Sequence, residues 1–185
     1  MALERLYNNP KPVTRFYLAS PLAFADWQNP TAAELNANPT NNPNGLIWNL
    51  TCAIAQDDTT HDLGDSDTDD ALSFCQIAGA ANPTSYNPEI SWSIFRDANR
   101  WIVSDTDSES VANLAFSLLA WRGVEYFAIA SVGKAYDQPF AAGDRIKSVR
   151  VATDYMADVV SSGESVRNTQ SFLNRGDITW NTEVA

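Results

Sequence analysis

The sequence is poor in the residues and runs that mark many functional classes. It has one histidine, two cysteines and 12 basic residues against 23 acidic ones, which gives a net charge of −11. No apolar run reaches the roughly 20 residues that span a bilayer. No basic region followed by an apolar stretch opens the chain, as a secretory signal would. We therefore expect a soluble protein that stays, at first, in the cytoplasm where it is made and has no membrane partner.

Motifs for catalysis are also missing. The sequence contains no glycine-rich phosphate loop, dinucleotide fingerprint, zinc spacing or nucleophile elbow. His61 lies in a polar stretch without such a motif, so we interpret it as an exposed loop residue. The sequence gives no indication for or against the carboxylate pair of a glycoside hydrolase. With 23 acidic residues some pairs are always present, and only their separation in space would decide. The sequence predicts no enzyme and no cofactor.

The charge and the cysteines suggest further limits. Tight nucleic-acid binding draws on lysine and arginine, so a net charge of −11 opposes it. The same charge suits a surface past which DNA slides without sticking. Cys52 and Cys75 lie in separate predicted strands. We interpret them as small buried apolar residues, with a cross-strand disulfide as the alternative.

Residues 104–123 are the one long helix that the sequence predicts. Thr106, followed three residues later by Glu109, predicts a capping box at its start. Gly123 is expected to end it. Four large residues at helical spacing predict an apolar stripe that packs on the rest of the protein. These helix-packing residues are Val111, Leu114, Leu118 and Trp121.

Most of the remaining chain has the alternation of β-strands. Strands are predicted at residues 14–20, 46–54, 71–78, 89–94, 100–103, 124–132, 144–154 and 172–180, the last interrupted by a turn at 174–177. In the second strand one face is expected to be buried, namely Leu46, Trp48, Leu50, Cys52 and Ile54. The predicted fold is a single domain over residues 1–185, mainly β, an antiparallel β-sandwich or β-barrel with one flanking α-helix.

Three segments fall outside this pattern. Residues 1–13 are predicted to be an extended N-terminal arm. Residues 21–45 are predicted to be a long loop with at most a short helix at 31–36. Residues 56–70 are predicted to be an acidic loop that joins two strands of a long hairpin. Its notable side chains are Asp57, Asp58, His61, Asp62, Asp65, Asp67, Asp69 and Asp70.

The acidic loop invites a comparison with calcium loops. Carboxylates alternate from Asp65, but Asp70 stands where such a loop needs glycine and Gln76 where it needs glutamate. We interpret the segment as a solvated hairpin tip, with a weak cation site as the alternative. Of the tryptophans, Trp48, Trp92 and Trp121 are expected in the core, and Trp27 and Trp101 are candidates for surface contacts.

Several stretches, quoted as they stand, resemble one protein family. They are the helix before Gly123, the strand 124–132, Gly-Asp-Arg-Ile-Lys-Ser-Val-Arg-Val-Ala-Thr-Asp at 143–154, the closing pattern Phe172-x-x-x-Gly176-Asp177-Ile-x-Trp180, and Pro30-Thr-Ala-Ala-Glu-Leu35. Over most of its length the chain resembles the major tail tube proteins of long-tailed, siphovirus-type bacteriophages, of the kind that infect actinobacteria.

This resemblance implies a structural virion protein. Family members form hexameric rings that stack into the tail tube, and their inner strands close into a barrel around the tape measure protein and later the DNA. The resemblance also implies tail terminator and distal tail proteins as partners. Residues 1–13 would be an arm on neighbouring subunits, and residues 56–70 an inter-ring loop. The alternative that the residues leave open is a monomeric carbohydrate-binding β-sandwich with exposed tryptophans.

Overall fold

The computed structural model describes residues 14–65, 68–69, 82–83, 86–96, 110–159 and 166–185. The strands are β1 Thr14–Ala19, β2 Ile47–Asn49, β3 Thr60–Leu63, β4 Thr68–Asp69, β5 Asn82–Pro83, β6 Pro88–Phe95, β7 Glu125–Val132, β8 Arg145–Val159 and β9 Arg167–Glu183. The helices are α1 Ala32–Leu35 and α2 Val111–Leu119, with short 3-10 turns η2 Pro21–Ala23 and η3 Thr51–Ala53.

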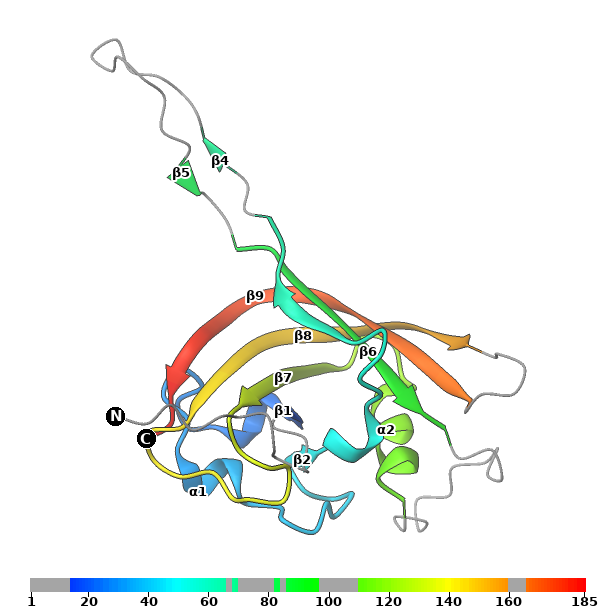
Figure 1. Ribbon diagram of the computed structural model, residues 1–185, viewed down its shortest axis with the longest axis horizontal. Helices are drawn as coiled ribbons and strands as arrows, with labels where there is room; N and C mark the ends of the chain where they lie inside the picture. The colour runs from blue at the N-terminus through cyan, green and yellow to red at the C-terminus, as the bar shows by residue number, and fades with distance from the viewer. Residues whose placement is uncertain (1–13, 66–67, 70–81, 84–85, 97–109, 160–165) are drawn as a thin grey trace, which may run out of the picture.

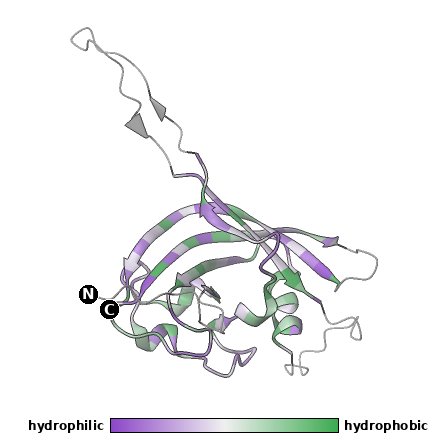
Figure 2. Cartoon of the chain, in the orientation of Figure 1, coloured by the Kyte–Doolittle hydropathy of each residue, from purple (hydrophilic) through white to green (hydrophobic). Residues whose placement is uncertain are grey.

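Seven strands form one antiparallel sheet in the order β2-β1-β7-β8-β9-β6-β3, and β4 pairs with β5 apart from it. Figure 1 shows β7, β8 and β9 as long arcs that curve over α2. Figure 2 shows polar and apolar bands alternating along these strands, as expected for a sheet with two distinct faces. The predicted fold class is confirmed: the protein is mainly β and antiparallel, with little helix.

The first core lies on the face that α2 covers. Trp92 is fully buried there and Trp48 nearly so, which confirms both predictions. The ring of Phe16 meets Trp92 edge-on, with the ring centroids 5.7 Å apart. The helix adds Leu114 and Leu119 to this core. The apolar positions of five strands thereby meet the apolar side of α2.

The second core lies on the opposite face, where residues 21–45 fold back over β1 and β7. The short helix predicted at 31–36 is confirmed as α1, and its N-terminus has a capping box between Thr31 and Glu34. Leu35 is buried in this core. Trp27 stacks on Phe127 at 5.7 Å, so at least part of its ring serves packing within the chain. Strand β7, the third in the sheet order, is therefore buried on both faces from Tyr126 to Ser131.

The prediction of one continuous strand over 46–54 is wrong. The strand β2 ends at Asn49, and η3 follows at once. The 3-10 turn breaks the alternation, so Cys52 is exposed and Thr51 is buried. Leu46 is 47% exposed because it precedes the strand. Only the other three members of the predicted face are buried: Trp48, Leu50 and Ile54.

The helix α2 is shorter than predicted. Its N-cap is Ser110, in extended conformation. The capping box predicted between Thr106 and Glu109 lies outside the described residues. Of the four helix-packing residues, Leu114 is buried, and Val111 and Leu118 pack half-buried against the core. The prediction for Trp121 is wrong: the helix ends at Leu119, and Trp121 is 73% exposed.

The long strands β8 and β9 also correct the prediction. Residues 174–177 do not form a turn, because β9 continues through them as a bulge opposite β8. Gly176 has a φ of 90° there, a conformation that favours glycine. The bulges increase the local twist and bend of the strands. The hairpin of β8 and β9 is therefore continuous over more residues than the neighbouring strands β7 and β6.

Candidate functional site

The hairpin of β8 and β9 extends past its neighbours on both sides. β7 pairs with β8 only at residues 146–152, and Thr153 bonds to the backbone of Gly123 and Val124. Residues 154–159 of β8 have no further strand beside them within the described part of the chain; we call them the β8 overhang. β6 pairs with β9 only at 167–171. We call residues 172–183 of β9 the β9 flank, because on that side they too have no strand partner among the described residues.

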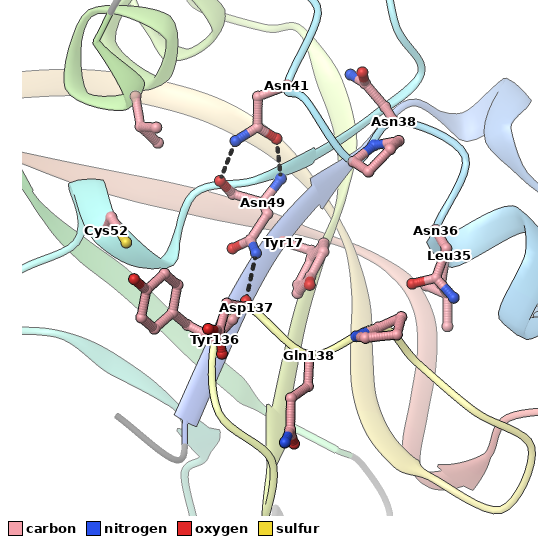
Figure 3. A pocket seen from close by; sticks show the side chains of 13 residues that line it. Tyr17, Leu35, Asn36, Asn38, Asn41, Asn49, Cys52, Tyr136, Asp137 and Gln138 are labelled. Atoms are coloured by element: carbon pink, nitrogen blue, oxygen red, sulfur yellow. Dashed lines mark hydrogen bonds between the residues drawn. The ribbon is translucent and has the colours of Figure 1, made fainter. Parts of the chain in front are cut away.

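The far edge of β2, by contrast, is covered from within the chain. The side chain of Asn41 donates from Nδ2 to the Asn49 carbonyl at 2.9 Å and accepts from the Asn49 amide at 2.7 Å. The amide of Asn41 thus takes the place of a neighbouring strand (Figure 3). An unpaired edge is a ready template for another chain, so this edge is closed while those of the hairpin are open.

Exposed apolar side chains gather near the β8 overhang. Tyr155, on the overhang, is 76% exposed. Trp121 lies close to the strand, because its carbonyl accepts a hydrogen bond from the Thr153 hydroxyl. Leu173 opposes Ala152 and is 43% exposed. Apolar groups of this size beside open backbone are typical of an interface with another protein surface.

The acidic loop predicted at 56–70 contains a strand. β3 occupies residues 60–63 and pairs with β6, so this part of the predicted loop belongs to a hairpin stem. The strand predicted at 71–78, which the loop was expected to join, lies outside the described residues. Asp57, Asp58, Asp62 and Asp65 are exposed. Asp67 and Asp70 lie outside the described residues, as does the side chain of Asp69. Of the predicted loop residues, the structure therefore describes the side chains of those at positions 57–65 only.

His61 is not the exposed loop residue that we predicted. It lies on β3, and its ring stacks between Trp92 and Trp180, at 6.2 Å from each ring centroid. Both ring nitrogens are shielded from solvent. Burial, together with the nearby Lys147 ammonium, lowers the pKa of His61 to about 4. The ring is therefore neutral at pH 7 and serves the first core.

A buried arginine is a feature that the sequence analysis missed. Arg15 is fully buried in β1; it donates to the Gln138 carbonyl at 2.9 Å and to the Ser131 hydroxyl at 3.1 Å. Its guanidinium lies 4.0 Å from the centre of the Phe140 ring and 3.8 Å from the Asp144 carboxylate. Desolvation by burial lowers the pKa of Arg15 from its usual range. The only sequence signal is its place in the alternation of β1.

A second missed group joins three strands on the face opposite α2. Arg150 of β8 donates from Nη2 to Glu125 of β7 at 2.7 Å and from Nη1 to Asp177 of β9 at 2.8 Å. Arg175 lies 3.5 Å from the same Glu125. We call these four residues the paired-arginine cluster. The hydrogen bonds that Arg150 donates to Asp177 and Glu125 raise its pKa. Each arginine is thus already engaged by a carboxylate of its own chain.

A hollow of about 410 Å³ lies between residues 35–52 and 136–139 (Figure 3). Its asparagines already have partners: Asn36 bonds to the Phe140 backbone, and Asn38 to that of Asn42. Asn49 donates to the Tyr136 carbonyl. Since these amides hold loops together, the hollow gives no support to a carbohydrate site. No described group of three or more acidic, histidine or cysteine side chains could hold a metal ion.

The fold and surface define a β-sheet structural subunit whose longest hairpin is open to further chains. The chain belongs to the phage tail tube protein family, whose family model matches residues 9–185. A search among curated proteins gives no match. Membership gives the protein a structural role in the phage tail. In the described part of the chain, neither helix is long and apolar enough to cross a membrane.

Proposed function

We propose that the protein is the ring-forming subunit of the tail tube of a long-tailed phage. Six copies form a ring, and stacked rings form a conduit for the tape measure protein and, during ejection, for DNA. Terminator and distal tail proteins bind the two ends of the tube. Assembly starts in the host cytoplasm from single subunits. Family membership supports the tube itself, and the open hairpin supports the way in which copies join.

The observation that carries this proposal is the pair of open edges on one hairpin. The β8 overhang and the β9 flank lie on opposite sides of the hairpin, because β7 adjoins β8 and β6 adjoins β9. A contact between two different edges is heterologous, and repeated heterologous contacts form a ring when the rotation from copy to copy closes. A sheet that continues from copy to copy around such a ring has no unpaired edge left.

Electron microscopy of concentrated, purified protein tests this proposal. We expect tubes, or ring-sized particles, that appear as the concentration rises. Purified subunits of this kind can stay monomeric without an initiator, so the distal end of a tail should be added in a second sample. Protein that remains monomeric in both samples would contradict the proposal.

The long hairpin is the second part of the proposal. We propose that residues 56–70 contact the next ring and that residues 1–13 contact neighbouring subunits. Figure 1 shows β4 and β5 beyond the curved sheet, on the continuation of the β3 and β6 stem. A segment on such an extension can reach a ring above or below without disturbing the sheet.

Shortening the extension tests the inter-ring role. Because β3 pairs with β6 through Leu63 and Pro88, the deletion must leave residues 60–63 and 88–95 in place. Replacing residues 66–85 by a short glycine-containing turn keeps this stem. We expect the isolated subunit to unfold at an unchanged temperature while stacking is lost, with at most single rings in micrographs. Tubes of normal length would show that the extension does not join rings.

A further inference from the structure

The paired-arginine cluster has no role in the cores and remains near the surface. Its side chains are between 34% and 44% exposed. Arg150 stands opposite Phe127 in the register of β7 and β8, so it lies on the face away from α2. The aromatic packing of the second core ends beside it. The cluster therefore occupies the uncovered part of a face whose other side is closed by the helix.

Ion pairing within the chain is not limited to this cluster. Seven basic side chains of the described part lie within 4.0 Å of a carboxylate oxygen: Arg15, Arg122, Lys134, Lys147, Arg150, Arg167 and Arg175. In the cluster, one guanidinium donates two short charge-assisted hydrogen bonds, at 2.7 and 2.8 Å. Acidic residues outnumber basic ones 23 to 12 along the chain. A passing polyanion therefore meets cations that already lie beside a carboxylate of the same chain.

We propose that the paired-arginine cluster faces the bore of the tube and prevents DNA from adhering to the wall, an inference that rests on the proposed function. A sheet that forms the wall of a ring turns one face to the bore. The face under α2 is filled by the helix and the first core. The opposite face carries the second core over β1 and β7 and is uncovered around the cluster. This uncovered part is the surface past which a long molecule can travel.

The carboxylates are what prevent adhesion. Without them, two bare arginines in each copy would give a ring of six about a dozen phosphate contacts, and contacts of this kind supply most of non-specific DNA affinity. Glu125 and Asp177 hold the guanidinium groups against the sheet and cancel their charge. The arginines in turn join β7, β8 and β9, so the surface is cross-linked without being adhesive.

The test is retention of purified protein on immobilised double-stranded DNA at low ionic strength. The variant E125Q/D177N releases both arginines and changes the net charge by two. The control D65N/E89Q changes the net charge equally at two exposed carboxylates that lie within 4.0 Å of no basic side chain in the described part of the chain. We expect the original protein and the control to flow through, and E125Q/D177N to be retained and released as salt rises.

Further samples make each outcome decisive. Adding R150Q/R175Q to E125Q/D177N should abolish retention, and E125Q alone, which frees Arg175, should give a smaller shift if the double variant does not fold. Equal retention of variant and control would overturn the inference, as would retention of the original protein. Because single subunits suffice on the column, this result is independent of whether tubes form, which micrographs of the same samples report separately.

Discussion

At the scale of single residues, His61 shows how burial converts a polar side chain into a core residue. Its ring lies between two tryptophans, and the pKa is lowered to about 4 by burial and by Lys147. In the unfolded chain the ordinary pKa is about 6.5. The unfolded state therefore binds more protons between these two values, and the free energy of unfolding falls as pH drops through this window.

Replacing His61 by phenylalanine should remove this pH dependence. We expect the free energy of unfolding of the variant, relative to the original protein, to rise by about 2 kcal/mol between pH 7 and pH 5. Urea denaturation of both proteins at several pH values measures it, and taking the difference cancels the titration of shared carboxylates. A difference that stays constant with pH would show that the imidazole is protonated equally in both states.

Residue-scale predictions from the sequence depended on whether the local pattern was regular. Trp48 and Trp92 were predicted to be buried, and they are, because their strands alternate in the expected way. The burial of His61 and Arg15 was not predicted, because a polar or charged side chain in a sequence pattern is normally taken as exposed. Both lie against aromatic rings from segments far away in sequence. Such enclosure depends on sheet order, which the pattern of one strand does not contain.

At the scale of elements, the bulge in β9 is the feature that most changes the hairpin. Asn174, Arg175, Gly176 and Asp177 were predicted as a turn because turn-forming residues are concentrated there. The structure keeps them in the strand and shifts the register opposite Val149 and Val151. Sequence alone cannot separate a turn from a bulge, since both use glycine at positive φ. The partner strand decides between them.

Replacing Gly176 by alanine isolates the cost of this conformation. A Cβ at this position would meet no atom within 4 Å, so the effect comes from the backbone φ of 90° alone. We expect a loss of about 1–2 kcal/mol in the free energy of unfolding. Chemical denaturation measures it, with the exposed S171A on the same strand as a control that should change little. An unchanged stability would mean that the bulge relaxes.

The helix and the loop before β2 show the same limit. The stripe on α2 was predicted from spacing, and Leu114 packs accordingly. Trp121 fits the same spacing, but the helix has ended before it. The capping box at Thr31 and Glu34 was not predicted, although its sequence pattern is present. Spacing indicates a face, whereas the end of an element depends on hydrogen bonds that spacing does not report.

At the scale of the whole molecule, the sequence predicted a mainly β fold and a structural role, and both are confirmed. The open edges could not be located beforehand. The strand predicted at 144–154 extends to Val159 in the structure. The added residues, 155–159, belong to the β8 overhang. Whether a strand extends beyond its neighbours depends on the lengths of all the paired strands and on their register. This property emerges only from the assembled sheet.

Charges placed beside the β8 overhang should block assembly without affecting folding. Trp121 and Tyr155 are 73% and 76% exposed, so W121K/Y155K should leave the unfolding temperature within a few degrees of the original. In micrographs we expect tubes or rings to be lost. The control is L22K, because Leu22 in η2 is 81% exposed and follows β1, which β7 separates from β8. Normal tubes from W121K/Y155K would place the contact between copies elsewhere.

The covered edge of β2 has a consequence for how samples age. Asn41 closes that edge with one donor and one acceptor, and it holds a left-handed φ of 54° while doing so. Slow hydrolysis of the amide in stored protein would replace the donor by a carboxylate oxygen facing the carbonyl of Asn49. Repulsion between this carboxylate and the carbonyl would then expose the edge of β2 that Asn41 covers in the intact protein. Old preparations should accordingly aggregate without forming tubes. Ion-exchange chromatography should place the aggregating protein in the more acidic fraction, which carries the hydrolysed Asn41.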